Sequence, residues 1–148
     1  MTALHMAGPQ DIARLLPLVA AFHTEVGIER SDELRARALT PLLEGIPHGV
    51  AYLFGLQKAP IGYVVISFGW SVELGGMDGY VDEIYIRPGV RGRGIGSEML
   101  LKLPKALAEV GLCALHLEVS RDNTRARALY EKLHFKARDQ YMLMTREM

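Results

Sequence analysis

The sequence predicts an α/β fold: one mixed antiparallel and parallel sheet of six or seven strands, with about four helices on both faces. Segments with apolar residues at helical spacing alternate with strand-like runs along the chain. Three consecutive strands joined by short turns pair antiparallel, whereas the strand–helix–strand unit over residues 80–119 needs a parallel crossover. The length of 148 residues suits one domain, residues 1–148.

The N-terminal third predicts a short strand and two helices. Residues 2–6 form the strand. Asp11 caps the first helix, which runs towards residue 25 and ends at a glycine, and Ser31 caps the second, which ends at another glycine. Pro17 and Pro41 lie within these helical patterns, where a kink or a break is expected because proline lacks the N–H group.

A β-rich region follows. Residues 50–56 and 61–70 are expected to form a hairpin around a polar turn at 57–60. Residues 73–79 contain three glycines and are expected to form a loop before a third strand at 80–86.

The remaining elements alternate between helix and strand. Residues 94–110 carry a helical apolar stripe, with a bend expected at Pro104. Residues 114–119 alternate as a strand, residues 123–133 form a helix, and residues 141–144 form the last strand.

Composition excludes several classes of protein. Seventeen basic residues balance 17 acidic ones, so no overall charge attracts nucleic acid or an anionic membrane. Cys113 is the only cysteine, which leaves no disulfide within the chain. No signal peptide, membrane span or metal-ligand pattern is recognised, and we expect a cytoplasmic protein without a metal.

The segment Arg91-Gly92-Arg93-Gly94-Ile95-Gly96 lies between a strand and a helix. Alternating glycines let the backbone approach a ligand, and the first N–H groups of the helix attract an anion. Two arginines add charge suited to phosphate oxygens. The segment therefore predicts a pyrophosphate site. The nucleoside-triphosphate loop pattern is absent, and the dinucleotide fingerprint fails because Ser97 or Met99 stands at its last position.

These six residues resemble the acyl-CoA signature of the GNAT superfamily, Arg/Gln-x-x-Gly-x-Gly/Ala. Residues 81–88 resemble the family's fourth strand. Residues 115–119 and 123–132 resemble its fifth strand and fourth helix. The resemblance implies a GNAT-like fold and an enzyme that transfers an acetyl group from acetyl-CoA to an amine. It also implies cofactor contacts at Ile84, Tyr85, Ile86, Arg91, Gly92, Arg93, Gly94, Ile95, Gly96, Ser97, Asn123 and Tyr130.

Acetyl transfer requires an acceptor for the amine proton and a proton donor for the departing thiolate. The resemblance implies an acidic residue on the fourth strand for the first role. Strand alternation points Asp82 and Glu83 to opposite faces, so we expect one of them, with Glu83 preferred, to face the site. Tyr130 matches the family's general acid, although its position also suits a core aromatic. A non-catalytic CoA-binding module remains an alternative.

Two further features concern the fourth helix and the acceptor. Asn123 is expected to cap the helix, and His134 replaces the family's usual glycine and must take a left-handed conformation. Residues 75–85 resemble polyamine and aminoglycoside acetyltransferases. Acidic residues near the site and in the first helices favour a cationic acceptor, with ordinary solvated charges as the alternative interpretation. A peptide or protein N-terminus is the alternative acceptor. Homodimers are frequent in this family, and a homodimer is left open here. The acidic residues are Glu25, Glu29, Asp32, Glu33, Glu73, Asp78, Asp82 and Glu83.

Overall fold

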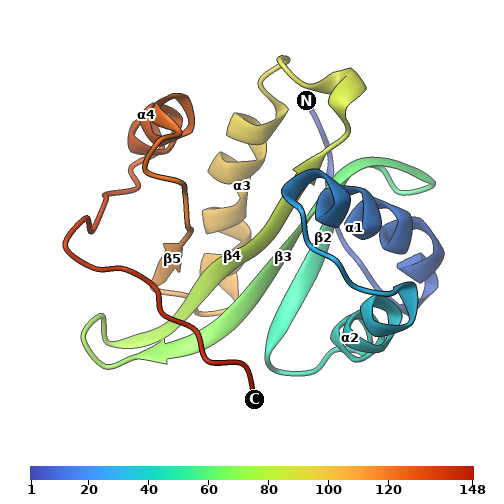
Figure 1. Ribbon diagram of the computed structural model, residues 1–148, viewed down its shortest axis with the longest axis horizontal. Helices are drawn as coiled ribbons and strands as arrows, with labels where there is room; N and C mark the ends of the chain where they lie inside the picture. The colour runs from blue at the N-terminus through green and yellow to red at the C-terminus, as the bar shows by residue number, and fades with distance from the viewer. The chain divides into compact units, whose positions relative to one another are not determined.

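The computed structural model describes residues 1–148 and divides into two compact units, Met1–Glu118 and Val119–Met148. The first unit holds a five-stranded sheet in the order β1-β2-β3-β4-β5 (Figure 1). Strands β1 to β4 pair antiparallel with their neighbours, and β5 pairs parallel to β4. The mixed α/β class is therefore confirmed, whereas the expected number of six or seven strands is wrong.

Two helices follow the first strand, β1 (Leu4–Met6). They are α1 (Ile12–Val26) and α2 (Asp32–Glu44), and each ends at a glycine in the left-handed region, with φ of 78° and 99° respectively. Both helices continue through their internal prolines, so neither proline causes a break. Tertiary packing of an apolar face sustains a helix despite the hydrogen bond that proline removes.

The two helices begin differently. Ser31 caps α2 as expected, because its hydroxyl oxygen accepts a hydrogen bond from the Leu34 N–H at 3.1 Å. Asp11 occupies the N-cap of α1, but its carboxylate makes no capping bond to the helix. It accepts from the Gly8 N–H at 2.9 Å and from Arg14 at 3.1 Å. Asp11 is fully buried, and these bonds fix the chain where it enters α1.

The central hairpins are longer than the sequence indicated. β2 (Gly49–Leu56) turns through residues 57–58 into β3 (Ala59–Ser71), and β4 (Gly76–Ile86) follows. The expected loop at 73–79 therefore shrinks to residues 72–75, because residues 76–79 pair with residues 68–71. Cross-strand pairing outweighs the low strand propensity of glycine there.

Helix α3 (Ile95–Glu109) crosses over to β5 (Ala114–His116), as the predicted parallel unit requires. The helix continues through Pro104. β5 is shorter than the expected 114–119, because β4 offers it partners only at residues 78–80.

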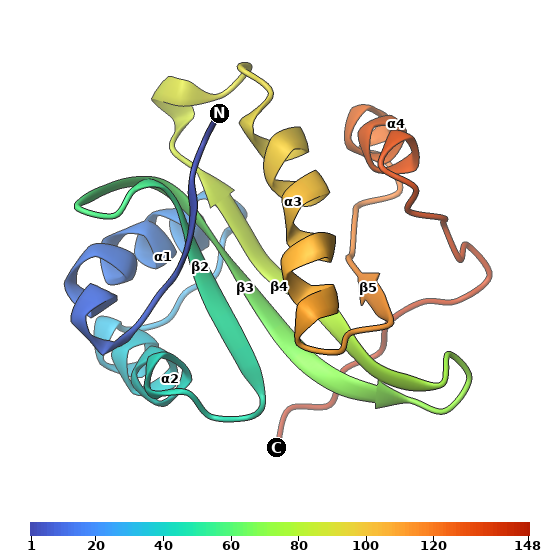
Figure 2. The ribbon, with the colours of Figure 1, turned by 180° about the vertical axis from the view of Figure 1, so that it is seen from behind.

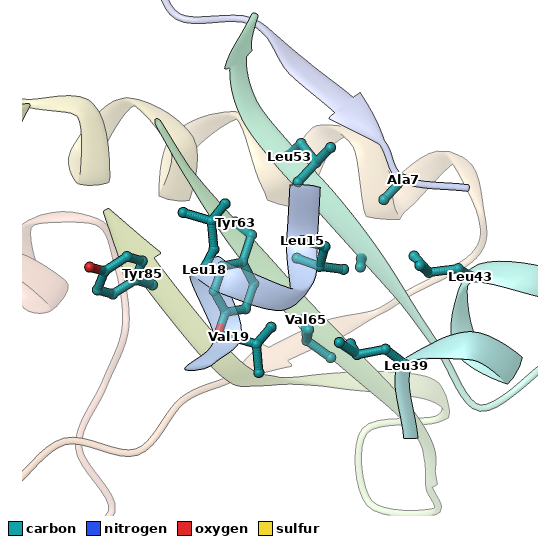
Figure 3. Packing of buried hydrophobic residues seen from close by; sticks show 11 residues of the cluster. Ala7, Leu15, Leu18, Val19, Leu39, Leu43, Leu53, Tyr63, Val65 and Tyr85 are labelled. Carbon is teal, nitrogen blue, oxygen red and sulfur yellow. The ribbon is translucent and has the colours of Figure 1, made fainter. Parts of the chain in front are cut away.

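Helices α1 and α2 cover one face of the sheet and α3 covers the other (Figures 1 and 2). The α1–α2 side buries Leu15, Leu18 and Val19 of α1 against alternate residues of the central strands (Figure 3). The intervening strand residues, such as Val64 and Ile66, are fully buried on the other side. Because the central strands are buried on both faces, they hold the side chains that they carry in fixed positions.

The second unit contains one helix, α4 (Thr124–Lys132), and no strand. The expected strand at 141–144 is absent, and those four residues are 61% to 83% exposed. A strand needs a partner for its backbone groups, and an apolar run alone does not supply one. No helix of the chain is long and apolar enough to cross a membrane.

Candidate active site

A carboxylate is held between two hydrogen-bond donors beneath α1. Glu83 of β4 accepts from the Tyr63 hydroxyl at 2.7 Å through Oε1, and its Oε2 lies 2.7 Å from His23 Nε2. Register explains the first contact, because Tyr63 pairs with Tyr85 and Val65 with Glu83, so these side chains share the α1 face of the sheet. The Glu83 side chain is 18% exposed, which leaves it partly open to solvent or to a ligand.

The tautomer of His23 follows from its second contact. Arg35 Nε lies 3.0 Å from His23 Nδ1, and a guanidinium can only donate hydrogen bonds. His23 Nδ1 therefore accepts, the proton of the neutral ring is on Nε2, and Nε2 donates to Glu83. Arg35 is itself paired with Asp32 at 2.8 Å. The result is a continuous chain of contacts from α2 through α1 to β4 and β3.

Burial and charge act on the groups around Glu83. Burial raises the pKa of the Tyr63 phenol far above its ordinary value, and the Glu83 charge adds to this effect. Tyr63 therefore remains a hydrogen-bond donor throughout the physiological pH range. Phe22, Tyr63 and Tyr85 pack ring against ring, with centroids 6.2 to 6.4 Å apart. This aromatic packing restricts solvent on one side of the carboxylate.

Asp82 stands at an irregularity in β4. Val65 pairs with Glu83 and Ile66 with Val81, so Asp82 is an extra residue in a β-bulge. The bulge interrupts the strict alternation that would send Asp82 and Glu83 to opposite faces. Loss of hydration raises the pKa of Asp82, and the nearby charges of Glu83 and Glu118 raise it further. Because Asp82 is exposed, solvent screening keeps these effects small.

The predicted phosphate-binding turn contains two glycines in a conformation that other residues rarely adopt. Gly92 and Gly94 have φ of 81° and 77°, in the left-handed region that favours glycine. Gly94 is the N-cap of α3 and offers no side chain to bond the first N–H groups of that helix. Those N–H groups and the helix dipole are therefore directed at an open turn, which suits phosphate oxygens.

Arg91 does not extend from this turn as a free cation. Its two terminal nitrogens contact the Glu25 carboxylate at 2.7 Å each, and its Nε donates to the Ile86 carbonyl at 2.8 Å. The guanidinium also lies over the Tyr85 ring, 5.4 Å from its centroid. Arg91 thus ties the turn to α1 and to the end of β4, while Arg93 is exposed.

One edge of β4 is unpaired beside this turn. β5 pairs only with residues 78–80, so no strand covers that edge from Val81 to Ile86. The Arg87 N–H bonds the Ile61 carbonyl of β3, and alternate residues of a strand present their N–H groups to the same side. The N–H group of Tyr85 therefore faces β3. The N–H groups of Ile84 and Ile86 face the free edge, where an extended ligand can accept hydrogen bonds from them.

The second unit carries the other predicted residues. The Asn123 side chain accepts from the Ala126 N–H at 3.1 Å, which confirms the helix cap. His134 has φ of 71° and is the only non-glycine residue with a positive φ, as its position required. Tyr130 packs edge-on against Phe135, with ring centroids 6.1 Å apart, and burial raises the pKa of its phenol.

The acidic residues expected near the site do not form one cluster. Asp78 is 7% exposed and bonds His116 Nε2 at 2.9 Å. Glu25 and Asp32 are paired with the two arginines described above. The negative charge available to a cationic acceptor is therefore smaller than the sequence suggested. No three His, Cys, Asp or Glu side chains lie together as a metal site.

His23 and Arg35 are functional candidates that the sequence reasoning missed. His23 follows Val19 by four residues, so it lies on the buried face of α1. A single titratable side chain on an apolar helix face was the sequence feature that could have indicated it. A hollow of about 590 Å³ opens at the α1–α2 connection. Its lining residues are His23, Thr24, Gly27, Ile28, Glu29, Arg30, Ser31 and Arg35. The hollow thus reaches the network at its His23 and Arg35 end.

Comparison with known proteins adds independent observations. The model of the acetyltransferase (GNAT) family matches residues 15–135. Mycothiol acetyltransferase of Mycobacteroides abscessus is 33% identical over 141 residues, covering 91% of this chain and 45% of that protein. Thialysine N-epsilon-acetyltransferase of Bos taurus is 36% identical over 73 residues, covering 49% of this chain and 42% of that protein. The matched region thus spans about half the length of these curated relatives or less.

A solved structure from Clostridium acetobutylicum, of a predicted acetyltransferase with acetyl-CoA, matches with a TM-score of 0.77. It covers 98% of this chain and 96% of that chain at 23% identity, a likeness that concerns the fold.

Proposed function

We propose, from the premise that this chain belongs to the acetyltransferase (GNAT) family, that it transfers an acetyl group from acetyl-CoA to the primary amine of a small cationic molecule. The observation that carries the proposal is the Glu83 carboxylate, held by two donors beside the free edge of β4. Acetyl-CoA supplies the activated acetyl group as a thioester.

The residues suited to hold acetyl-CoA lie along one continuous path. The uncapped N-terminus of α3, with Gly92 and Gly94 before it, fits the pyrophosphate. The N–H groups of Ile84 and Ile86 can donate hydrogen bonds to carbonyl oxygens of an extended arm. A hydrogen bond from one of them to the thioester oxygen would stabilise the charge that develops on that oxygen.

Glu83 is proposed to accept the amine proton, directly or through a water molecule. An alkyl ammonium has an ordinary pKa near ~10, so the acceptor must lose a proton before its nitrogen attacks. Asp82, the neighbouring carboxylate, adds negative charge that favours binding of the cationic amine. Tyr130 is proposed to protonate the departing thiolate, as the family resemblance implies, and Asn123 to contact the cofactor arm.

The proposed acceptor class is supported by the names of two relatives. The bovine relative is named as an acetyltransferase of the N-epsilon position of thialysine, and the mycobacterial relative as an acetyltransferase of mycothiol. A peptide N-terminus is the second candidate acceptor.

The test is acetyl-CoA-dependent thiol release with a panel of polyamines, aminoglycosides, amino acids and short peptides. We expect release with one class of small amines. Glu83→Gln should lower kcat by about 10²- to 10⁴-fold, the usual contribution of a positioned base. The control is Glu44→Gln, at an exposed position on α2.

Unchanged turnover in Tyr130→Phe would remove Tyr130 as the acid. Acetyl-CoA binding without turnover of any amine would favour a non-catalytic module.

A further inference from the structure

Arg35 of α2 contacts the ring of His23, and this contact affects the proposed base, Glu83. His23 Nε2 donates to Glu83 only while the ring is neutral in this tautomer or doubly protonated. In the doubly protonated form, a full positive charge would be hydrogen-bonded to the carboxylate. Such a charge stabilises the carboxylate and makes it a weaker proton acceptor.

Arg35 occupies the position where the second proton would attach. Its Nε lies 3.0 Å from His23 Nδ1, so protonation of Nδ1 requires this hydrogen bond to break. Asp32 contacts the Arg35 guanidinium at 2.8 Å, and the Arg35 side chain is only 10% exposed, so the arginine is held in place. The same contact argues against His23 as a relay that carries protons from Glu83 to the hollow.

We propose that Arg35 is a positioning residue that holds His23 in its neutral Nε2–H tautomer and thereby preserves Glu83 as a proton acceptor. The inference rests on the proposed function of Glu83, but the state of His23 can be measured without turnover. Removing Arg35 allows the ring to take up a proton at Nδ1 at a higher pH than in the wild type. The charged and titratable groups that act on His23 are Asp82 and Glu83 of β4 and Arg35 of α2. Tyr63 of β3 contacts Glu83, and Asp32 contacts Arg35.

The first measurement uses long-range ¹H–¹⁵N NMR spectra of the histidine rings in the ¹⁵N-labelled full chain. The five histidines are resolved, and His23 is assigned as the signal lost in His23→Gln. We expect the neutral Nε2–H tautomer for His23 at pH 7.5. An Nδ1–H tautomer or an imidazolium at that pH would overturn the proposal. This measurement needs no Arg35 variant, so it decides the question even if such a variant fails to fold.

The second measurement follows the same signal from pH 8 to pH 6 in Arg35→Met. The variant should protonate His23 at a higher pH than the wild type. The control, Arg37→Met, removes an exposed arginine from the same helix and should titrate like the wild type. If Arg35→Met titrates like the wild type, or if both variants shift equally, Arg35 has no specific effect on His23.

The third measurement compares kcat/KM of each variant with that of the wild type across the same pH range. A proton on Nδ1 turns the donor of Glu83 into a cation, so the Arg35→Met ratio should fall as the pH is lowered from 8 to 6. The ratio should stay constant for Arg37→Met. It should also stay constant for the double variant His23→Gln with Arg35→Met, because an amide can donate to Glu83 and does not titrate.

The outcomes separate the two proposals. If no amine is acetylated, the proposed function fails, whereas the NMR spectra still decide the role of Arg35. If an amine is acetylated and the Arg35→Met ratio does not change with pH, the positioning role is wrong and the proposed function stands.

Discussion

Replacing Tyr63 by phenylalanine removes one hydroxyl from a fully buried ring and leaves the packing volume nearly unchanged. The hydroxyl donates to Glu83 Oε1 at 2.7 Å. Hydrogen bonds to charged groups contribute about 1.5–3 kcal/mol, and losing one partner leaves the carboxylate incompletely satisfied. We therefore expect Tyr63→Phe to lower the free energy of unfolding by about 2 kcal/mol. For a protein of this size, that corresponds to a Tm decrease of about 4–8 °C.

The assay is thermal unfolding at pH 7, with Tyr52→Phe as the matched control. Tyr52 is a 6% exposed ring on the neighbouring strand, and burial and the charge of Glu109, rather than a hydrogen bond, raise the pKa of its hydroxyl. The control should therefore change the stability by less than about 0.5 kcal/mol.

A double-mutant cycle tests the cause of the effect. In the Glu83→Gln background the charge is absent, so Tyr63→Phe should cost about 1 kcal/mol less than in the wild type. Equal Tm values for Tyr63→Phe and Tyr52→Phe, or no coupling between positions 63 and 83, would refute the proposed contact between the phenol and the carboxylate.

Three further predictions concern the turn and the charged groups near it. Gly94→Ala should cost about 1–2 kcal/mol in thermal unfolding, because φ is 77° there. Gly89→Ala, at a position with open space and no positive φ, should cost almost nothing. The hydrogen bond from Arg91 lowers the pKa of Glu25 in the folded protein. The ion pair therefore stabilises the fold fully above the pKa that Glu25 has in the unfolded chain, and this stabilisation disappears as the pH falls through the pKa of Glu25 in the folded protein. Glu25→Gln should thus cost at most about 1 kcal/mol at pH 7 and nothing near pH 2, measured as Tm against pH. The pKa of Asp82 in the folded protein is raised instead, mainly by loss of hydration. Ionisation of Asp82 therefore destabilises the fold as the pH rises from the pKa of the unfolded chain through that of the folded protein. Asp82→Asn should therefore match the wild-type Tm near pH 3 and slightly exceed it at pH 7, and a lower Tm at pH 7 would contradict this account.

Local sequence patterns predicted the mixed α/β class, the helices and the glycine-rich turn before α3. These features depend on local chemistry. A positive φ at Gly92 and Gly94 is a property of the residue type, and the apolar spacing of α1 or α3 is repeated within the segment itself. The left-handed conformation of His134 was predicted instead from the family resemblance, because glycine usually stands at that position.

The strand limits and the contacts within the site depend on tertiary packing. The loop at 73–79 became mostly strand, and residues 141–144 formed none, because each outcome depends on whether a partner strand lies alongside. The bulge at Asp82 exists only in the pairing of β4 with β3.

The proposed base shows the difference most clearly. Glu83 was a candidate from its strand and from the family resemblance, whereas its donors come from positions 20 residues away on β3 and 60 residues away on α1. Arg35 belongs to yet another element, α2. No local pattern links these residues, because their contacts arise only when α1 and α2 pack on the sheet. The sequence therefore determined which groups are available for chemistry, and the packing decided which of them act together.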